Sequence, residues 1–247
     1  MINLRLFCLF VMDLLLLPVI AEAADPLPPS SATPTVATFS IVAIDPVTGE
    51  IGVAVQSRIV GVGGIVPFAR AGIGAVATQA YANVGYGPAG LAAMAAGIAP
   101  EEALTLLTEN DGLRENRQVG LINAAGVAAN FTGRECMDWA GGIVGENFAV
   151  QGNILAGGEV VVAMAAAFRE STGLLAERLL AVLKAGQSAG GDKRGMQSAA
   201  LLIVREGWGY GGLNDRFRDI RVDEHTDPIT ELERVYRAHC KLFPRPE

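Results

Sequence analysis

The sequence predicts a single layered α+β domain in which two β-sheets lie face to face and pairs of helices pack outside them. Three observations predict this fold. Segments with strand character and segments with helix character come in blocks, whereas a doubly wound parallel sheet needs strands and helices that alternate one for one. Hydrophobic residues make up 51% of the chain and charged residues only 18%, which is enough for a continuous core. The length of 247 residues suits one domain once a targeting segment is removed.

A β-hairpin opens the predicted domain and is the clearest local pattern in the sequence. Residues 38–45 and 50–57 are rich in β-branched and other apolar side chains. The loop PVTG at residues 46–49 supplies the proline and glycine that a short hairpin connection favours. We therefore expect the two segments to be adjacent antiparallel strands.

The segments that follow continue the blocks. Helices are predicted where a proline or an acidic residue can begin one or where a glycine can end one: 88–96, from 100 onward, 159–170, 174–185 and 228–242. Strands are predicted for short β-rich runs: 74–79, 119–123, 127–131, 147–151, 198–205 and 218–223. The run 198–205 is almost wholly apolar, as expected of a strand covered on both faces, and the polar run 218–223 is expected at a sheet edge.

Residues 1–23 have the pattern of a secretory signal peptide. Arg5 precedes an apolar run, and the segment ends in Ala21-Glu22-Ala23, the small-x-small pattern that signal peptidase accepts. Asp13 interrupts the run and disfavours a membrane-spanning helix, because a charge near the bilayer centre is costly.

Residues 24–37 are rich in Pro, Ser and Thr, and we expect them to form a linker or propeptide. The folded domain is then residues 38–247. Export followed by processing predicts a secreted or periplasmic protein without stable insertion in a membrane.

The charge balance and the scarcity of histidine exclude several classes of function. The chain has 19 Lys and Arg against 26 Asp and Glu and no basic block, so it is not expected to bind nucleic acid. Its two histidines, His225 and His239, form no cluster with zinc-ligand spacing, and neither a metal nor another cofactor is expected. The glycines at 72–74 precede a strand, whereas a dinucleotide-binding fingerprint follows one.

Cys136 and Cys240 are the cysteines outside the predicted signal peptide. An oxidising compartment permits them to pair, but two distant cysteines form no disulfide framework, so their pairing stays open. The sequence also leaves open whether the chain forms a homo-oligomer.

Polar side chains at the ends of predicted strands are candidate substrate-binding residues. Gln79, Asn83, Gln151 and Asn153 could hydrogen-bond an amide or carboxylate substrate, or supply an oxyanion hole. They could equally close turns, where asparagine is favoured.

Asp192, Arg194 and Ser198 lead into the strand 198–205 as a second candidate group. The alternative for this group is a salt bridge within a loop.

Residues 186–190 match the G-x-S-x-G motif of a hydrolase nucleophile elbow. That elbow requires a strand before the serine and a helix after it, whereas here a helix comes first. We therefore do not expect Ser188 to be a nucleophile.

Five stretches of the chain resemble the domain-of-unknown-function 1028 family (DUF1028), which is placed in the N-terminal-nucleophile (Ntn) hydrolase superfamily. They are TFSIVAIDPVTGEIGVAVQSR, RAGIGAVATQAYANVGYGPAGL, AVQGNILAG, GGDKRGMQSAALLIVR and GYGGLNDR. The resemblance covers roughly residues 38–232. It implies a four-layer αββα sandwich whose first strand begins with a Thr, Ser or Cys nucleophile that is made N-terminal by removal of the preceding residues.

By this resemblance Thr38 is the candidate nucleophile, with its own α-amine as the base that accepts the hydroxyl proton. Thr35-Val36-Ala37 before it is a passable small-x-small cleavage site. If the chain is cut only after Ala23, Thr38 stays internal and has no α-amine. The alternative is that Thr38 is simply the first residue of a β-strand, where threonine is common.

The resemblance also implies electrostatic support for the nucleophile. Arg70 stands near the place of the lysine that supports the nucleophile in proteasome-type enzymes, and Arg58, which follows the second strand, is a candidate substrate-binding residue. Both could equally be ordinary loop charges. Gln56 stands where those enzymes have an acid, which removes a charge from that site.

These observations predict an amidohydrolase that cleaves the C–N bond of a small-molecule or peptide-like amide, with Thr38 and Arg70 as catalytic residues. The alternative is a catalytically silent Ntn-fold protein that binds a small ligand or a partner at the cell surface.

Overall fold

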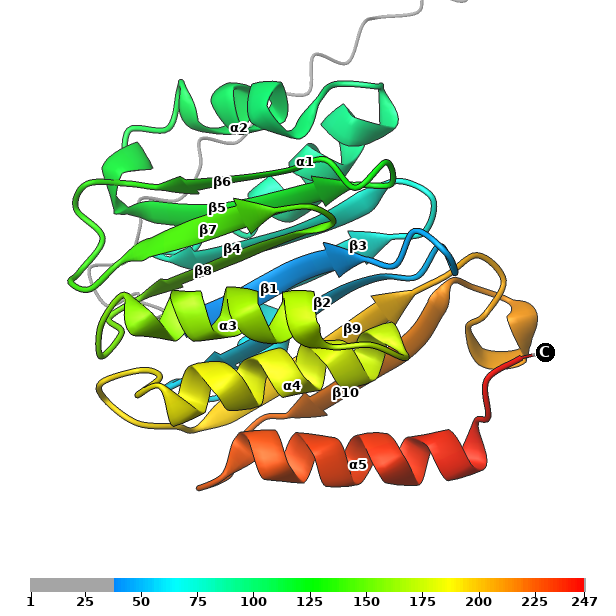
Figure 1. Ribbon diagram of the computed structural model, residues 1–247. Helices are drawn as coiled ribbons and strands as arrows, with labels where there is room; N and C mark the ends of the chain where they lie inside the picture. The colour runs from blue at the N-terminus through cyan, green and yellow to red at the C-terminus, as the bar shows by residue number, and fades with distance from the viewer. Residues whose placement is uncertain (1–37, 247) are drawn as a thin grey trace, which may run out of the picture. The chain divides into compact units, whose positions relative to one another are not determined.

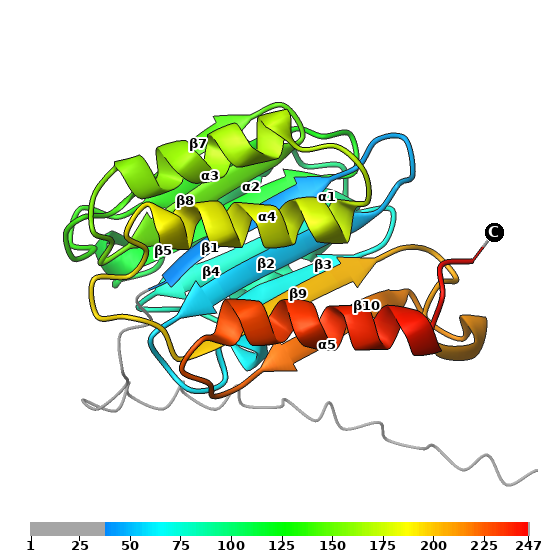
Figure 2. The same ribbon diagram turned by 60° about the horizontal axis from the view of Figure 1, so that its bottom comes forward.

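Residues 38–246 are described by a computed structural model, in which they form an α+β structure with two antiparallel sheets and five helices (Figures 1 and 2). The predicted signal peptide, residues 1–23, and the predicted linker, residues 24–37, lie outside the described residues.

The larger sheet has six strands in the order β10-β9-β2-β1-β8-β7. Its strands are β1 (Thr38–Ile44), β2 (Ile51–Ser57), β7 (Gly141–Gly145), β8 (Phe148–Asn153), β9 (Ser198–Val204) and β10 (Arg216–Val222). All neighbours pair antiparallel. The register of the first pair runs from Thr38 opposite Ser57 to Ile44 opposite Ile51, which confirms the predicted hairpin.

The smaller sheet has four strands in sequence order, β3 (Pro67–Arg70), β4 (Gly74–Ala80), β5 (Arg117–Asn123) and β6 (Ala128–Thr132). The helices are α1 (Tyr86–Ala95), α2 (Pro100–Thr108), α3 (Glu159–Glu170), α4 (Leu175–Ser188) and α5 (Pro228–Leu242). The helices α3 and α5 have the predicted bounds, because Gly158 and Asp227 precede their first turns and Ser171 and Phe243 end them.

The apolar side chains fall into three groups that explain how the elements pack. Alternate residues of the six-stranded sheet, such as Phe39 and Ile41, pack against α3, α4 and α5. The intervening residues, such as Val42 and Val53, pack with Ala77 and its neighbours from the four-stranded sheet. The other face of that smaller sheet packs against α1 and α2. Because strand side chains alternate between faces, each strand of the hairpin contributes to two apolar layers.

The sequence missed the strands β3 and β7. The strand β7 has the sequence GGIVG, and glycine is depleted in strands because it has no side chain to pack. The strand β3 is only four residues long and begins at Pro67. The predicted edge position of the polar strand near residue 218 is confirmed, since β10 is the outermost strand of the six-stranded sheet.

The cysteines Cys136 and Cys240 are both free thiols. They lie on different parts of the fold, the first in the loop between β6 and β7 and the second in α5. Ser188 of the G-x-S-x-G match is the last residue of α4, so a helix precedes it as expected.

Candidate functional site

A row of four polar side chains crosses the six-stranded sheet at one end. The strand registers place Ser198, Ser57, Thr38 and Asn153 side by side on β9, β2, β1 and β8. Directly opposite residues in antiparallel strands point to the same face of the sheet. All four are fully buried. We call this set the polar row.

The face changes from polar to apolar along the strands. Two residues beyond the polar row, Ser40 and Gln151 are still polar, while their neighbours Val55 and Ala200 are apolar. The next row contains only apolar side chains: Leu202, Val53, Val42 and Ala149. The layer between the two sheets is therefore an ordinary apolar core except at the end where Thr38 lies.

The four-stranded sheet supplies a matching polar set. Gln79 on β4 lies opposite Gln118 on β5, which in turn lies opposite Thr132 on β6. The two glutamines are fully buried. With Thr38, Ser40, Ser57, Gln151 and Asn153 they form what we call the inter-sheet polar cluster. None of these seven side chains carries a charge.

Gln118 is the centre of the inter-sheet polar cluster. Its Oε1 accepts hydrogen bonds from Gln79 Nε2 at 2.8 Å and from Asn153 Nδ2 at 2.9 Å. Its Nε2 donates to Thr132 Oγ1 at 2.9 Å and to the carbonyl oxygen of Gly152 at 2.8 Å. Both polar atoms of a buried amide are thus satisfied, as burial in a dry interior requires.

Thr38 lies at the edge of this cluster. Its hydroxyl donates to Ser57 Oγ at 3.1 Å, and its carbonyl oxygen accepts a long hydrogen bond from Gln79 Nε2 at 3.4 Å. Gln79 also accepts a short hydrogen bond from Ser40 Oγ at 2.6 Å. The first residue of β1 is thereby connected to both sheets.

Two acceptor atoms in the cluster have no partner among residues 38–246. They are Gln151 Oε1 and Asn153 Oδ1. The Gln151 side chain is held by Ser40, to whose hydroxyl oxygen its Nε2 donates at 2.7 Å. It also fills the space left by Gly120, where a Cβ would lie 2.2 Å from Gln151 Oε1. An unsatisfied buried oxygen beside Thr38 is suited to accept a hydrogen bond from an N–H group of a ligand.

The charged candidates at this end form a rim. Arg58 directly follows Ser57, and its guanidinium donates to the carbonyl oxygens of Arg194 at 3.2 Å and Met196 at 3.5 Å. Arg194 forms a two-pronged ion pair with buried Asp192, at 3.2 and 3.0 Å. Arg58 and Arg194 therefore supply positive charge next to the ends of the strands that carry the polar row.

Ser198 has a clear local role. Its hydroxyl donates to the carbonyl oxygen of Ile59 at 2.6 Å and accepts from the backbone N–H of Val62 at 3.1 Å. These two bonds attach the loop after β2 to the start of β9.

The structure does not bring Arg70 and Asn83 to the inter-sheet polar cluster. Arg70 is exposed and lies opposite Gly74 at the far end of β4 from Gln79, roughly 17 Å along the strand. Spacing in the sequence could not show this, because the short hairpin of β3 and β4 reverses the chain. Asn83 lies in a turn, where its Oδ1 accepts from the N–H of Gly85 at 3.0 Å.

Gln56 does not face Thr38. The hairpin register places Gln56 opposite Phe39, so its side chain lies on the face of the sheet that packs against α4, and Ser57 takes the place beside Thr38. Both polar atoms of the Gln56 side chain lack a partner among residues 38–246. The sequence-based expectation that Gln56 replaces an acid beside Thr38 is therefore wrong, because Gln56 lies on the other face of the sheet.

Sequence reasoning missed Gln118, Ser40 and Ser57. Ser40 lies inside a predicted strand, Ser57 is the last residue of one, and Gln118 directly precedes the predicted strand 119–123, which in the structure begins at Arg117. The alternation Gln118, Gly120, Ile122 gives the one available signal. That alternation shows which side chains share a face but not which sheet lies opposite them.

A second polar cluster, around Asp111, lies on the helix-covered face of the four-stranded sheet. Asp111 Oδ2 accepts from Arg117 Nε at 2.9 Å and from the Tyr86 hydroxyl at 2.7 Å, and its Oδ1 accepts from the N–H of Leu113 at 2.8 Å. Burial by itself raises the pKa of Asp111, but the hydrogen bonds from Arg117, Tyr86 and Leu113 outweigh it and hold the pKa well below its usual range. The cluster fixes the start of β5, one residue before Gln118.

Asp111→Asn is expected to lower the free energy of unfolding at pH 7 by about 3 kcal/mol, because Arg117 loses its buried counter-charge. The pKa of Asp111 in the folded protein is below its unfolded value of about 4. Asp111 therefore stabilises the fold fully at pH values above about 4, and this stabilisation is lost as the pH falls from there towards the folded pKa. Urea unfolding of both proteins at pH 7 and pH 3 measures this. Glu115→Gln, which removes an exposed pair with Arg134, is the control and should change little. An equal difference between wild type and Asp111→Asn at both pH values would contradict the assignment.

Within residues 38–246, no group of three or more His, Cys, Asp and Glu side chains is arranged to hold a metal ion. In the same part of the chain, every helix is too short or too polar to span a bilayer.

Comparison with known proteins identifies a family and solved structures of similar fold. Residues 38–232 match the model of a family described as a family of unknown function, DUF1028. The chain is also similar to protein SPO2555 from Silicibacter pomeroyi, whose crystal structure carries the same family designation. The two chains are 34% identical with a TM-score of 0.76, and the match covers 83% of this chain and 86% of that chain. No curated protein matches the chain.

Proposed function

The chain belongs to the DUF1028 family, and on that premise we propose that it is an Ntn-type amidohydrolase with an αββα sandwich fold. Its nucleophile is Thr38, exposed by cleavage of the bond between Ala37 and Thr38. The observation that carries this proposal is the position of Thr38: it is the first residue of β1 and lies in the polar row, at the end where the layer between the two sheets changes from apolar to polar.

The chemistry follows from the neighbours of Thr38. Cleavage gives the residue an α-amine, which takes the proton of the Thr38 hydroxyl directly. The hydroxyl oxygen attacks the carbonyl carbon of the substrate amide, the C–N bond breaks, and the departing amine takes up the proton. Water then hydrolyses the acyl ester and restores the Thr38 hydroxyl.

The neutral surroundings favour the free amine. Burial disfavours a charged group and lowers the pKa of an amine below its ordinary value of about 8. The inter-sheet polar cluster contains no charged side chain that would reverse this effect. An α-amine at Thr38 would therefore lose its own proton more readily than an exposed one and be able to accept the hydroxyl proton. The α-amine of Thr38 can thus act as the base without help from Arg70.

Two side chains are placed to bind the substrate amide. Asn153 lies opposite Thr38, its Nδ2 held by Gln118 and its Oδ1 without a partner among residues 38–246. We assign to it the recognition of the amide group, by accepting the substrate N–H at Oδ1. Gln79 Nε2, which already reaches the Thr38 carbonyl oxygen, is the candidate donor to the oxyanion. Arg58 on the rim would attract a substrate that carries a carboxylate.

The proposal includes export and two stages of processing. Signal peptidase removes residues 1–23, and a second cut removes residues 24–37. A secreted or periplasmic location follows from the first step.

Intact mass and N-terminal sequencing of the protein purified from its native host test the proposal most directly. We expect the mature chain to begin at Thr38 and to release amine from at least one member of a panel of N-acyl amino acids, dipeptides and cell-wall amides. A stable mature chain that begins at Ala24 and hydrolyses none of these amides would contradict the proposal.

The second candidate function is that of a silent Ntn-fold protein that binds a small ligand. It is favoured by the complete burial of the Thr38 side chain in the uncleaved chain. Under this alternative, amines are released from none of the amides although the chain begins at Thr38.

A further inference from the structure

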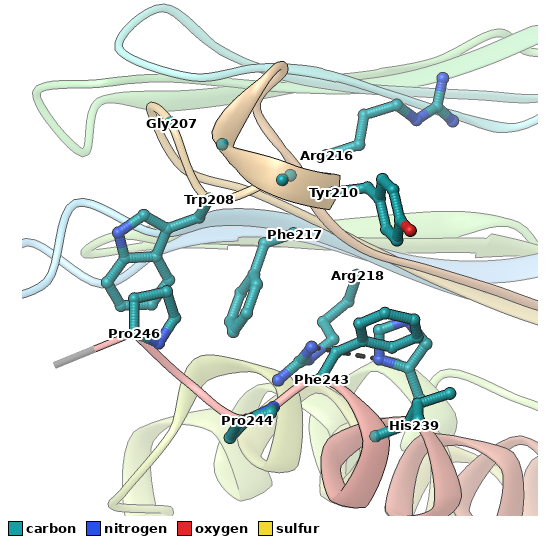
Figure 3. A pocket seen from close by; sticks show the side chains of 14 residues that line it. Gly207, Trp208, Tyr210, Arg216, Phe217, Arg218, His239, Phe243, Pro244 and Pro246 are labelled. Carbon is teal, nitrogen blue, oxygen red and sulfur yellow. Dashed lines mark hydrogen bonds between the residues drawn. The ribbon is translucent and has the colours of Figure 1, made fainter.

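A cavity of about 350 Å³ lies at the end of the six-stranded sheet opposite Thr38 (Figure 3). It is lined by the loop 207–212, by the start of β10 and by the C-terminal end of α5 with the residues after it. Arg216 pairs with Val204, whereas the polar row contains Ser198 at the other end of β9. At about 3.4 Å per residue the two sites are roughly 20 Å apart along the strand. We call this space the C-terminal cavity.

An irregularity in β10 shapes the floor of the cavity. The register of β10 with β9 shifts between Arg216 and Arg218, which leaves Phe217 unpaired. In a regular strand consecutive side chains point to opposite faces, but a bulge can turn two neighbours to the same side. Phe217 and Arg218 are both buried, at 8% and 3% exposure, and both line the cavity.

Arg218 is a buried cation without an anion. Among residues 38–246 no carboxylate forms an ion pair with it: its guanidinium hydrogen-bonds the Cys240 thiol, and Glu50 is held by Arg245 through both oxygens at 3.0 Å. The guanidinium instead stacks on Phe217, 3.7 Å from the ring centre, and hydrogen-bonds His239 Nδ1 at 3.1 Å. Buried charges in proteins are normally paired, so the Arg218 site has an unmet demand for negative charge.

His239 holds the guanidinium of Arg218 in place without neutralising its charge. Because a guanidinium can only donate, His239 Nδ1 must accept the hydrogen bond from Arg218, and the ring proton is then on Nε2. Burial, and then the positive charge of Arg218, lower the pKa of His239, so the ring is neutral near pH 7. Figure 3 shows His239 and Arg218 together at one side of the cavity.

Aromatic rings form the rest of the lining. The Trp208 ring meets Phe217 edge-on with the ring centres 4.9 Å apart, and Tyr210 meets Phe243 edge-on at 6.1 Å. Tyr210 is 77% exposed, although an aromatic ring is usually at least half buried. Its short turn, η3 (Tyr210–Gly212), ends in Gly211 and Gly212, both with φ near +70°. That left-handed backbone requires glycine and presents the tyrosine at the cavity mouth.

We propose that the C-terminal cavity binds a small aromatic carboxylate, whose carboxylate group pairs with the guanidinium of Arg218 and whose ring packs against Tyr210, Trp208 and Phe243. The positive charge of Arg218 matches the carboxylate group, and the aromatic lining matches the ring. A volume of about 350 Å³ suits a ligand with one or two rings.

Fluorescence of Trp208 tests the proposal in the full chain. The chain has two tryptophans, so Trp139→Phe leaves Trp208 as the reporter. We expect phenylacetate to change its emission saturably and the neutral analogue phenylacetamide to bind at least about tenfold more weakly, because it lacks the charge. Inorganic phosphate should give no saturable change. No saturable change with phenylacetate up to about 10 mM, or equal binding of phenylacetate and phenylacetamide, would overturn the proposal.

Variants on this background separate binding from folding. Arg218→Met should weaken phenylacetate binding about tenfold or more, with exposed Arg221→Met on the same strand as its control. If Arg218→Met fails to fold, Tyr210→Ala carries the test, since that side chain is exposed; it should weaken binding about fivefold. Leu213→Ala, which is 87% exposed and outside the cavity lining, should not. Unchanged binding in Tyr210→Ala contradicts the proposal.

Thr38→Ala should bind phenylacetate normally. The test of the C-terminal cavity is therefore independent of the test of the proposed hydrolase activity.

Discussion

Thr38→Ala is expected to reduce amide hydrolysis by roughly 10³-fold or more, because it removes the only protein oxygen that forms a bond to the substrate carbon in the proposed mechanism. Thr38→Ser keeps that oxygen and the α-amine and loses only a methyl group, so it should retain activity within about tenfold. Initial rates on the best substrate of the amide panel, compared at equal amounts of correctly processed protein, measure both effects.

Folding and processing must be separated from chemistry in this comparison. The Thr38 hydroxyl donates to Ser57 Oγ, so Thr38→Ala also removes one buried hydrogen bond, worth about 1 kcal/mol. Ser57→Ala removes the same hydrogen bond but keeps the nucleophile, and is the matched control. We expect it to lose the same stability but much less activity. If Ser57→Ala and Thr38→Ala are equally inactive, the loss follows from the hydrogen bond and Thr38 is not the nucleophile.

The sequence predicted the parts of the fold whose pattern is local. The hairpin of β1 and β2 is such a part, since its two β-rich runs and the PVTG loop lie within 20 residues of each other. The bounds of α3 and α5 are also local, because caps and glycines near their ends decide them. Where local preference was weak, as in the glycine-rich β7, the strand exists only because β8 pairs with it.

The candidate site could be predicted only in part, because its geometry depends on which sheet lies opposite which. Thr38, Gln79, Gln151 and Asn153 are brought together as strand-end residues, but Gln118, which joins them, gives no local signal of its position. Arg70 was assigned by its distance in sequence from Thr38, and that distance says nothing about the direction in which a strand returns. The side of the sheet that Gln56 faces depends on a register that a single residue of slippage would reverse.

Gln118→Met is expected to lower the free energy of unfolding by about 4 kcal/mol. Methionine has nearly the same length and flexibility as glutamine, so the change removes hydrogen bonds more than volume. It leaves Asn153 Nδ2 and the Gly152 carbonyl oxygen without the partner that the wild type provides, and it takes the closest acceptor from Gln79. Each buried group left unsatisfied costs roughly 1–3 kcal/mol. Urea unfolding at pH 7 gives the measurement.

The same substitution at Gln56 should have the opposite outcome. Gln56 and Gln118 are both fully buried glutamines on strands, but neither polar atom of the Gln56 side chain has a partner among residues 38–246. The cost of burying an unpaired amide is then already present in the wild type, and Gln56→Met should be neutral or stabilise the fold by about 1–2 kcal/mol. Equal losses in the two variants would mean that methionine fits neither position. A large loss at Gln56 alone would mean that this amide is satisfied in solution, by buried water or by a bound ligand between β2 and α4.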